Sequence, residues 1–290
     1  MEEKKINRKA ENRKKFFRAL FKRKIVIIGA VGVGIFVLMA ILAPLIAPYD
    51  PAAVSLMATN QGPSAEHLLG TDNFGRDVLS RIIYGARVSL LVGVFAVAIA
   101  CVIGTFLGML AAYFGGWVDA VIMRMCEAVM AIPNTVLAMA LIAVFGGGMR
   151  NLAIILGVST IPGYVRMMRA QALSTKELDY IMAGKLQGSS NLRLMYKHIL
   201  PNCLSPIIVM MTQQVGQTIL VEAGLSFLGI GISIPTASWG TMVSDGKAFL
   251  MTNPVFAISP GVCIALLVIC LNLFGDGIRD ALDPRLRGEA

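Results

Sequence analysis

The chain has 290 residues, of which 56% are hydrophobic and 15% are charged, and its mean hydropathy is +0.72. Soluble domains carry about a quarter of charged residues, so this composition excludes an ordinary soluble protein and favours a membrane protein. The formal charge is +9, but 11 of the 26 Lys and Arg residues precede Ile25. A basic run directly before a long apolar segment is typical of a cytoplasmic anchor and not of a nucleic-acid site.

The first candidate span is the apolar run 25–47. It is about twice as long as the hydrophobic part of a signal peptide, and no small-residue cleavage site follows it. We therefore expect a retained spanning helix. Residues 1–24 then form a cytoplasmic basic tail, and residues 25–85 form an N-terminal transmembrane helix with an extracytoplasmic segment after it.

Five more stretches offer roughly the 20 apolar residues that a spanning helix needs. They are 88–112, 119–145, 151–168, 202–223 and 255–274. Pro133 predicts a kink in the third span, and the GxxxG pattern of Gly104 and Gly108 predicts close helix packing in the second. Arg124 and Glu127 in the third span are spaced to form an ion pair. The sequence thus predicts an all-α, polytopic membrane protein with six transmembrane helices.

The distribution of Lys and Arg predicts the orientation, because basic residues collect in short cytoplasmic loops. Six spans place both chain ends on one side. That side holds eleven Lys and Arg in the tail 1–24, six in the loop 166–202 and three in the tail 276–290. The other side holds five, and Arg124 is assigned to neither; the five are Arg76, Arg81, Arg87, Arg150 and Lys247. We therefore expect both termini and the loop 166–202 in the cytoplasm.

No catalytic or metal-binding pattern is recognisable in the sequence. The phosphate-binding pattern GxxxxGK[ST], the esterase pattern GxSxG and the zinc pattern HExxH are absent. His67 and His198 fall on opposite sides of the membrane in the predicted topology, and the five cysteines lie in or beside apolar spans without CxxC spacing. We therefore expect no catalytic residues and no metal ligands on this chain, which is not an enzyme by itself.

The cytoplasmic loop contains a predicted amphipathic helix over residues 177–187. Leu178, Ile181, Met182 and Leu186 recur at helical spacing. The run Gly-Ser-Ser-Asn at 188–191 ends this helix, and a second short helix is expected at 192–198. The apolar face either packs on the chain's own helix ends or the lipid surface, or it docks into a groove of a soluble partner.

The same loop resembles the EAA loop of ABC importer permeases, whose pattern is E-A-A, then Gly, then I-x-L-P. The matching segments are 179–188 and 198–202. Met182, Ala183 and Gly184 fall on E-A-A, although Met182 and Gly184 depart from it, and His198 stands in place of the isoleucine. The residues that the resemblance assigns to ATPase coupling are Asp179, Tyr180, Met182, Ala183, Gly184, Gly188, His198, Leu200 and Pro201.

Motifs outside the loop resemble the dipeptide/oligopeptide/nickel permease family of ABC importers, and they extend over residues 17–287. They include APLIAPYDP at 43–51, HLLGTD at 67–72, GRDVLSR at 75–81, YGARVSL at 84–90, EAGLSFLG at 222–229 and GDGIRDALDPR at 275–285. The extra first span and the external segment that follows it resemble one of the two permeases that pair in these transporters.

The resemblance implies a type I ABC importer permease fold, with the permease domain at 86–275 between the N-terminal unit and the tail 276–290. It also implies the partners: a homologous second permease, two ATPase subunits that bind ATP and magnesium, an extracytoplasmic substrate-binding protein, and membrane lipid. No cofactor is expected on this chain. The implied location is the cell (inner) membrane of a bacterium or archaeon.

A few residues outside the loop are candidates for a direct part in transport. Glu222 either lines the pathway or braces the external segment 226–253, because an ionisable group at membrane depth is costly and suggests a function. Pro133 is a second pathway or gate candidate. Pro235, Trp239 and Gly240 are candidates for contact with the binding protein, although Trp239 also suits a side chain anchored at lipid headgroups.

The predicted function is the permease subunit of an ATP-driven importer of dipeptides or oligopeptides. Nickel or metal chelates and glutathione-like compounds are alternative substrates, because the resemblance implies that the binding protein sets most of the selectivity. An ATP-independent secondary transporter or channel is the alternative of another class. Such proteins usually carry charges in the pathway or repeated halves, and this sequence has few of the former and no visible repeat.

Overall fold

The computed structural model describes residues 20, 21 and 23–282. Residues 1–19, 22 and 283–290, which hold most of the two predicted tails, lie outside this description. The described chain is helical, and its only β pairing is an isolated bridge between Thr71 and Asp77. The predicted all-α class is confirmed.

Five described helices are long and apolar enough to cross a membrane. They are α2 (Lys24–Ile41), α4 (Val78–Phe114), α7 (Met149–Lys176), α10 (Leu200–Phe227), which the preceding turns extend back to Asn191, and α12 (Pro254–Leu282). A sixth candidate span is formed by α5 (Gly116–Met130) and α6 (Asn134–Phe145), which qualify only when the bent pair is counted as one. The predicted number of six spans is therefore confirmed, with one of them broken.

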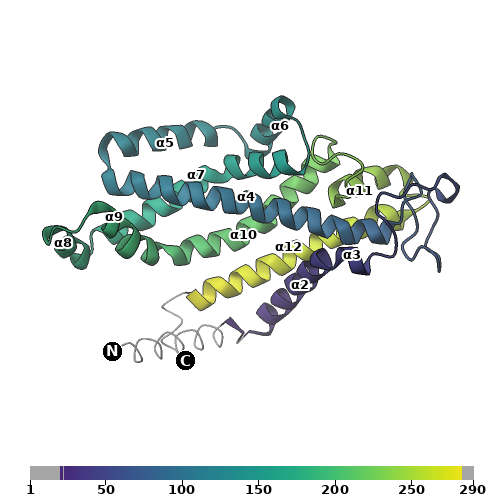
Figure 1. The fold of residues 1–290 in the computed structure, drawn as a ribbon, viewed down its shortest axis with the longest axis horizontal. Helices are drawn as coiled ribbons and strands as arrows, with labels where there is room; N and C mark the ends of the chain where they lie inside the picture. Colours follow the sequence, from purple (N-terminus) through teal and green to yellow (C-terminus); the bar gives the residue numbers. More distant parts are fainter. Residues whose placement is uncertain (1–19, 22, 283–290) are drawn as a thin grey trace.

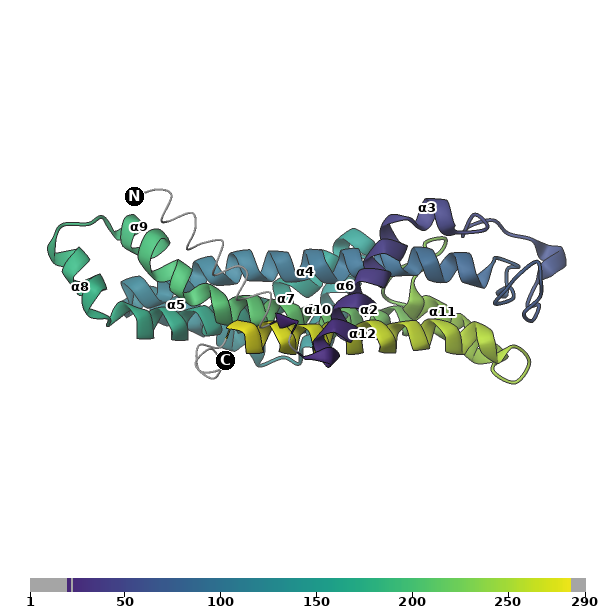
Figure 2. The same ribbon diagram turned by 90° about the horizontal axis from the view of Figure 1, so that it is seen from below.

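The shorter elements lie at the two ends of the bundle. At one end are α8 (Asp179–Leu186) and α9 (Asn191–Arg193), followed by the π-helical segment η2 (Leu194–Ile199). At the other end are α3 (Ala43–Ile46), η1 (Leu56–Ala58), α11 (Trp239–Gly246) and η3 (Lys247–Phe249). Figures 1 and 2 show α4, α7, α10 and α12 running along the bundle between these ends, with α2 lying obliquely across α12.

The contact between α4 and α7 depends on two glycines. A Cβ added at Gly104 would lie 2.4 Å from the Cβ of Tyr164, and one added at Gly108 would lie 2.5 Å from the carbonyl oxygen of Val165. Since real side chains do not approach this closely, only glycine lets the two helices pack here. The predicted packing role of the GxxxG pattern is confirmed, and its partner is another helix of the same chain.

The second span is longer than the sequence predicted, because α4 begins at Val78 and not near residue 88. Its 37 residues correspond to about 55 Å at 1.5 Å per residue, well beyond a hydrocarbon core of about 30 Å. The sequence prediction began this span after the charged Arg87, whereas α4 continues back over Arg87 and over Arg81, whose side chain is only 1% exposed. The extra turns form the base of the extramembrane end.

The third span is broken and not merely kinked. α5 ends at Met130, α6 begins at Asn134, and the two axes differ by 87°. Pro133 occupies the N-cap position of α6 with extended backbone dihedrals, so its ring starts a new helix and does not bend an existing one. The prediction of a kink at Pro133 is corrected to a break of three residues.

The second short helix expected at 192–198 is not a separate element. α9, η2 and α10 follow one another without a break, and together they extend from Asn191 to Phe227. Pro201 has no N–H to donate to the preceding turn, and a wider π turn next to a proline accommodates that loss. Motion of the loop would therefore be transmitted directly to a membrane helix.

The described ends of α2 and α12 meet. Arg23, just before α2, forms an ion pair with Asp280 near the end of α12, with Nη1 and Oδ2 2.6 Å apart. Leu20, Val26 and Ala281 form a small buried cluster at the same place. Both ends of the described chain thus lie on the half of the bundle that carries α8 (Figure 1).

Candidate functional site

The helix α8 presents an uncovered apolar face at the tip of the bundle (Figure 1). Leu186 is 89% exposed, and Met182, Tyr180 and Leu178 are each about half exposed. Of the four apolar residues in the predicted stripe, only Ile181 is buried, at 3%. The rest of this face has few contacts within the chain. Packing against the chain itself therefore explains only Ile181, and the other three apolar side chains remain uncovered.

Ile181 fixes α8 to the body of the protein. It belongs to the cluster of buried side chains that includes Met195 and Ile199 of η2 and Met168 of α7. Gly184 faces the same segment, and a Cβ there would lie 3.1 Å from Cδ2 of Leu194. On the other side, Asn202 donates from Nδ2 to the hydroxyl of Tyr180 at 3.1 Å. These contacts make α8 a rigid projection.

Gly188 ends α8 in a left-handed turn, with φ of +78°. Its N–H donates to the carbonyl oxygen of Lys185 at 3.1 Å, and the N–H of Ser189 donates to that of Gly184 at 3.1 Å. This pair of bonds is the Schellman motif, which favours glycine because other L-residues are strained there. The predicted glycine turn is confirmed in its geometry, and its part in coupling stays a prediction.

Polar contacts hold the base of the loop, and the sequence did not predict them. The ammonium of Lys176 donates to the carbonyl oxygens of Ala112 and Tyr113 at 3.2 and 2.8 Å, where α4 ends. The hydroxyl of Tyr113 donates to Oδ1 of Asn191 at 2.7 Å. A cation at the last carbonyls of a helix is favoured by the helix dipole. The start and the end of the loop are thereby tied to one helix terminus.

Two ion pairs lie on α5. Arg169 of α7 makes a two-point contact with Asp119, with Nε–Oδ1 and Nη2–Oδ2 distances of 2.5 and 2.6 Å. Arg124 and Glu127 lie 2.9 Å apart, as their spacing predicted, and both are largely exposed. An exposed pair contributes about 0–1 kcal/mol. The Asp119–Arg169 pair is the one that joins α5 to the body of the bundle.

Glu222 lies in a position that favours the predicted brace over the predicted pathway role. Its side chain is 0% exposed, and it accepts hydrogen bonds from the hydroxyls of Ser89, Ser226 and Ser238 at 3.1, 2.9 and 2.9 Å. These serines lie on α4, on α10 and just before α11. Of the two roles predicted for Glu222, the structure supports the brace of the external segment, because no surface of the carboxylate is open to a solute.

Trp239 and Gly240 are also buried, which argues against the contact with a binding protein that was predicted for them. Trp239 is 0% exposed; its indole N–H donates to the carbonyl oxygen of Ile82 at 2.9 Å, and its ring packs edge-on against Phe36. A Cβ on Gly240 would lie 2.3 Å from the carbonyl oxygen of Ala223. The headgroup position considered for Trp239 is excluded as well. Pro235, in contrast, is exposed.

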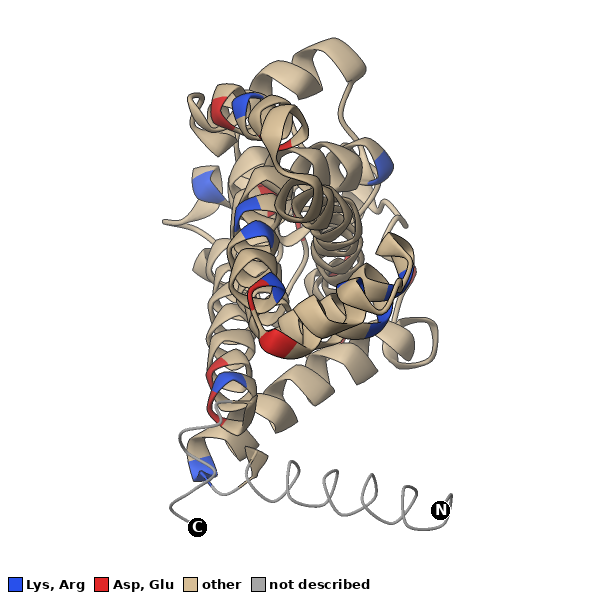
Figure 3. Cartoon of the chain, turned by 90° about the vertical axis from the view of Figure 1, so that its left-hand side faces the viewer, with Lys and Arg blue, Asp and Glu red and all other residues tan. Residues whose placement is uncertain are grey.

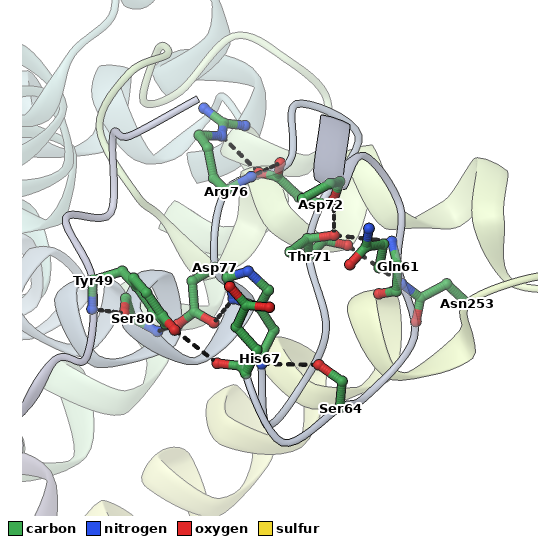
Figure 4. A network of polar contacts seen from close by, with 12 residues as sticks. Tyr49, Gln61, Ser64, His67, Thr71, Asp72, Arg76, Asp77, Ser80 and Asn253 are labelled. Carbon is green, nitrogen blue, oxygen red and sulfur yellow. Dashed lines mark hydrogen bonds and ion pairs between the residues drawn. The ribbon is translucent and has the colours of Figure 1, made fainter. Parts of the chain in front are cut away.

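The segment 47–77 folds back onto the start of α4 through a network of polar contacts (Figure 4). Asp77 caps α4 by accepting from the N–H of Ser80 at 2.8 Å, and its other oxygen lies 3.0 Å from Nδ1 of His67. The amide of Asn253, just before α12, donates to the carbonyl oxygens of Gln61 and Thr71 at 3.1 and 3.3 Å. We call residues 47–77 the external lobe; these contacts order it without a hydrophobic core.

A buried charge cluster lies under the external lobe. Asp72 accepts from Nε of Arg76 at 2.6 Å, and Nε of Arg81 lies 3.4 Å from the same carboxylate. Arg81 also donates to the carbonyl oxygen of Pro51 at 3.1 Å. Burial raises the pKa of the nearby Asp245 carboxyl above its ordinary value, although Arg81 and Arg76 oppose that rise. The Gly-Thr-Asp and Gly-Arg-Asp motifs therefore build this lobe.

Two adjoining cavities open on one side of the membrane helices. The larger, of about 530 Å³, is lined by Met210, Gln213, Gln214, Gln217, Asn272 and Asp276. The smaller, of about 280 Å³, includes Pro133 and Asn134 from the α5–α6 break and residues of α7. Met210 and Gln214 line both cavities, so the two are contiguous. Pro133, a predicted pathway candidate, thus lines a cavity. The glutamines that line the cavities were not predicted from the sequence.

The described chain thus has an exposed helical tip at α8, a membrane bundle, and the external lobe at the far end. The family model for the binding-protein-dependent transport system inner membrane component matches residues 104–288. The chain belongs to this family. A second model, the N-terminal TM domain of oligopeptide transport permease C, matches residues 13–63 of this permease.

Curated relatives match the permease over most of its length. The dipeptide transport system permease protein DppC of Alkalihalophilus pseudofirmus is 44% identical over 271 residues, which are 93% of this chain and 89% of the relative. DppC of Haemophilus influenzae is 42% identical over 267 residues, 90% of each chain. The glutathione transport system permease protein GsiD of Pectobacterium atrosepticum is 39% identical over 279 residues, 94% of this chain and 91% of the relative.

These matches confirm the resemblance inferred from the motifs and the permease fold expected from it. They also decide against the ATP-independent transporter or channel, since the family is that of binding-protein-dependent transport systems. The permease is thus a multi-pass membrane subunit of such a system.

Proposed function

We propose that this permease imports dipeptides or oligopeptides in an ATP-driven transporter. The family membership supports the transport role, and the names of the two relatives at 44% and 42% identity support the peptide substrate. The observation that carries the mechanism is the uncovered apolar face of α8, which projects rigidly from the end of the bundle. An exposed apolar face of this kind is more stable in the groove of a soluble subunit than in water.

Coupling then works through one stiff connection. An ATPase subunit that moves α8 also moves η2 and α10, because the chain is helical without a break from Asn191 to Phe227. The ATP and magnesium would be bound by two separate ATPase subunits, and this chain would supply no catalytic group. The coupling surface comprises the predicted residues on the exposed face of α8, foremost Tyr180 and Met182, together with Leu186, which was not among those predicted.

The α8 end is proposed to be cytoplasmic. Four basic residues, Lys176, Lys185, Arg193 and Lys197, lie in or beside the loop that carries α8. Figure 3 looks onto this end and shows basic and acidic segments among otherwise uncharged helices. Since basic residues collect on the cytoplasmic side, both chain ends would also be cytoplasmic, and the membrane would be the inner membrane of a bacterium or archaeon.

The opposite end would face the substrate-binding protein outside the cytoplasm. The external lobe and the exposed turn around Pro235 are the surfaces available there, because Trp239 and Gly240 are buried. A homologous second permease would complete the passage. Glutathione is a second candidate substrate, favoured by the 39% identity to the GsiD protein over 94% of this chain.

The proposal is tested by placing a charge on the exposed face of α8 in the complete transporter. Leu186→Asp should release the ATPase subunits during purification and abolish uptake of a labelled dipeptide into proteoliposomes that contain the binding protein. Met251→Asp is the matched control, because Met251 is 97% exposed at the opposite end. Retained ATPases and uptake in Leu186→Asp would remove α8 from the coupling role. If the wild-type transporter imports no peptide, the proposal that peptides are its substrate is refuted.

A further inference from the structure

A band of polar side chains, most of them amides, lies on the membrane helices α10 and α12. Gln214 is the 15th of the 28 residues of α10, and Gln213 and Gln217 lie within one turn of it. Asn272 is the 19th of the 29 residues of α12, and Asp276 follows it by one turn. We call the four amide residues the amide band, and the carboxylate of Asp276 lies beside it. They line one cavity of about 530 Å³.

The amide band is open and not packed away. Gln217 and Asp276 are exposed, and Gln213, Gln214 and Asn272 are half-buried. Gln213 donates from Nε2 to Oδ1 of Asp276 at 3.4 Å, which joins the two helices across the cavity. A polar group left unsatisfied in hydrocarbon costs several kcal/mol. This side of α10 and α12 therefore faces water or a polar partner, and not lipid.

The polar surface continues beyond the amide band. The adjoining cavity shares Met210 and Gln214 and reaches Ser159 and Asn134. In the part of the chain that the structure describes, the buried Oδ1 of Asn134 has no hydrogen-bond partner. Asn134 thus adds a polar residue to the lining of this cavity at the α5–α6 break. Helices α6, α7, α10 and α12 thus each place a polar side chain in the lining of the two contiguous cavities.

The residue types argue for a passage and against a dry helix interface. Membrane helices pack through small residues, and the packing of α10 on α12 already uses them: a Cβ on Gly275 would lie 2.9 Å from Oγ1 of Thr212. The long amides of the band lie beside this contact and leave a cavity. A passage wall needs contacts that are favourable enough for entry and weak enough for release.

We propose that the amide band forms this permease's share of the substrate passage and hydrogen-bonds the main-chain amides of the peptide in transit. A carboxamide donates and accepts at once, as a peptide group does, and it carries no charge. It therefore recognises the chemistry common to all peptides and ignores their side chains. The inference rests on the proposed function, which supplies peptides as the substrate class.

The test uses the complete transporter, with its binding protein, in proteoliposomes. Gln217→Leu removes the amide at nearly constant size, and Gln217→Asn keeps it. The rate of uptake of a labelled tripeptide at saturating binding protein should fall about threefold to tenfold in Gln217→Leu, as the loss of one uncharged hydrogen bond predicts. Gln217→Asn should recover most of the rate. Subunit composition and thermal unfolding should equal those of the wild type in both variants.

A second measurement does not depend on transport. The thiol introduced by Gln217→Cys should react with a membrane-impermeant thiol reagent, above the labelling of the wild type, whose described cysteines are buried or half-buried. Uptake at the wild-type rate in Gln217→Leu, or no labelling of Gln217→Cys, would overturn the amide band while leaving peptide import in place. Loss of the second permease from the Gln217→Leu complex would show a subunit interface and also overturn it.

Discussion

The hydroxyl of Ser238 donates a hydrogen bond of 2.9 Å to the carboxylate of Glu222, which ties the last turns of α10 to the residue before α11. Ser89 extends the same contact to α4. One buried acid thus joins three segments that are far apart in the chain. Its position near the far end of a membrane helix suggested a pathway role, and its burial favours a structural one.

Replacing Glu222 should therefore affect stability before transport. Glu222→Ala leaves three buried hydroxyls without their acceptor and should destabilise the permease by about 1–3 kcal/mol. Glu222→Gln keeps an acceptor and should be affected less. Thermal unfolding in detergent measures both, and Glu127→Gln is the control because Glu127 is largely exposed. A stable Glu222→Gln transporter that assembles fully but does not import would restore the pathway role.

Trp239 offers a second test of the corrected assignments. Trp239→Ala should cost about 3–5 kcal/mol, because it removes a fully buried ring and its hydrogen bond to Ile82. Trp117→Ala should cost little by comparison, since Trp117 is 77% exposed. Yield and thermal unfolding of the two variants give the comparison. Equal stability of both, with binding-protein-dependent uptake lost only in Trp239→Ala, would show a docking residue after all.

The features that the sequence predicted well are those with a local signal. Six spans follow from runs of apolar residues, and the α8 helix follows from a repeat of four apolar side chains around residues 178–186. The turn at Gly188 follows from glycine's access to positive φ. Each of these depends on neighbours within about one or two turns, which a single sequence displays. The family motifs then supplied the partners.

The features that were missed depend on distant residues. Glu222 is 133 residues from Ser89, and the Trp239 indole is 157 residues from its acceptor Ile82. No local pattern reports such pairs. The early start of α4 was missed because Arg87 and Arg81 interrupt the apolar run, although Asp72 pairs with the buried Arg81 in the fold. The coupling, pathway and binding-protein assignments that remain are still predictions.

Substitutions at Gly188 distinguish the effect of backbone geometry from the effect of side-chain size. Gly188→Asn should retain coupled import, because asparagine tolerates the left-handed conformation, whereas Gly188→Val and Gly188→Arg are strained by about 1–2 kcal/mol. A Cβ at this position meets nothing within 4 Å, so bulk alone has no effect on this chain. In the strained variants, α8 should lose its fixed end, and uptake should fall while ATP hydrolysis no longer responds to the binding protein.

Gly62→Val is the matched control for this series. A Cβ added at Gly62 would also meet nothing within 4 Å, but the φ of this residue is not in the positive region. Import by this variant should stay at the wild-type rate. Wild-type uptake and ATPase stimulation in Gly188→Arg would show that the turn after α8 has no part in coupling.

Asp72 is the residue on which the external lobe depends most. Asp72→Asn would leave the guanidinium groups of Arg76 and Arg81 buried without a full counter-charge, and breaking a buried pair costs about 3–5 kcal/mol. The loss should be local, because the lobe is held by polar contacts and not by a hydrophobic core. We expect faster proteolysis of residues 47–77 in the purified transporter, with the membrane bundle intact.

Asp50→Asn is the control, since Asp50 is exposed and its contact with the N–H of Ala52 needs only an oxygen acceptor. The external lobe of the Asp50→Asn variant should resist protease as the wild-type lobe does. If Asp72→Asn resisted equally, the two arginines would be held by Asp245 and by carbonyl groups such as that of Pro51. Adding Asp245→Asn would then remove the remaining counter-charge, and a lobe that still resisted protease would not depend on the charge cluster at all.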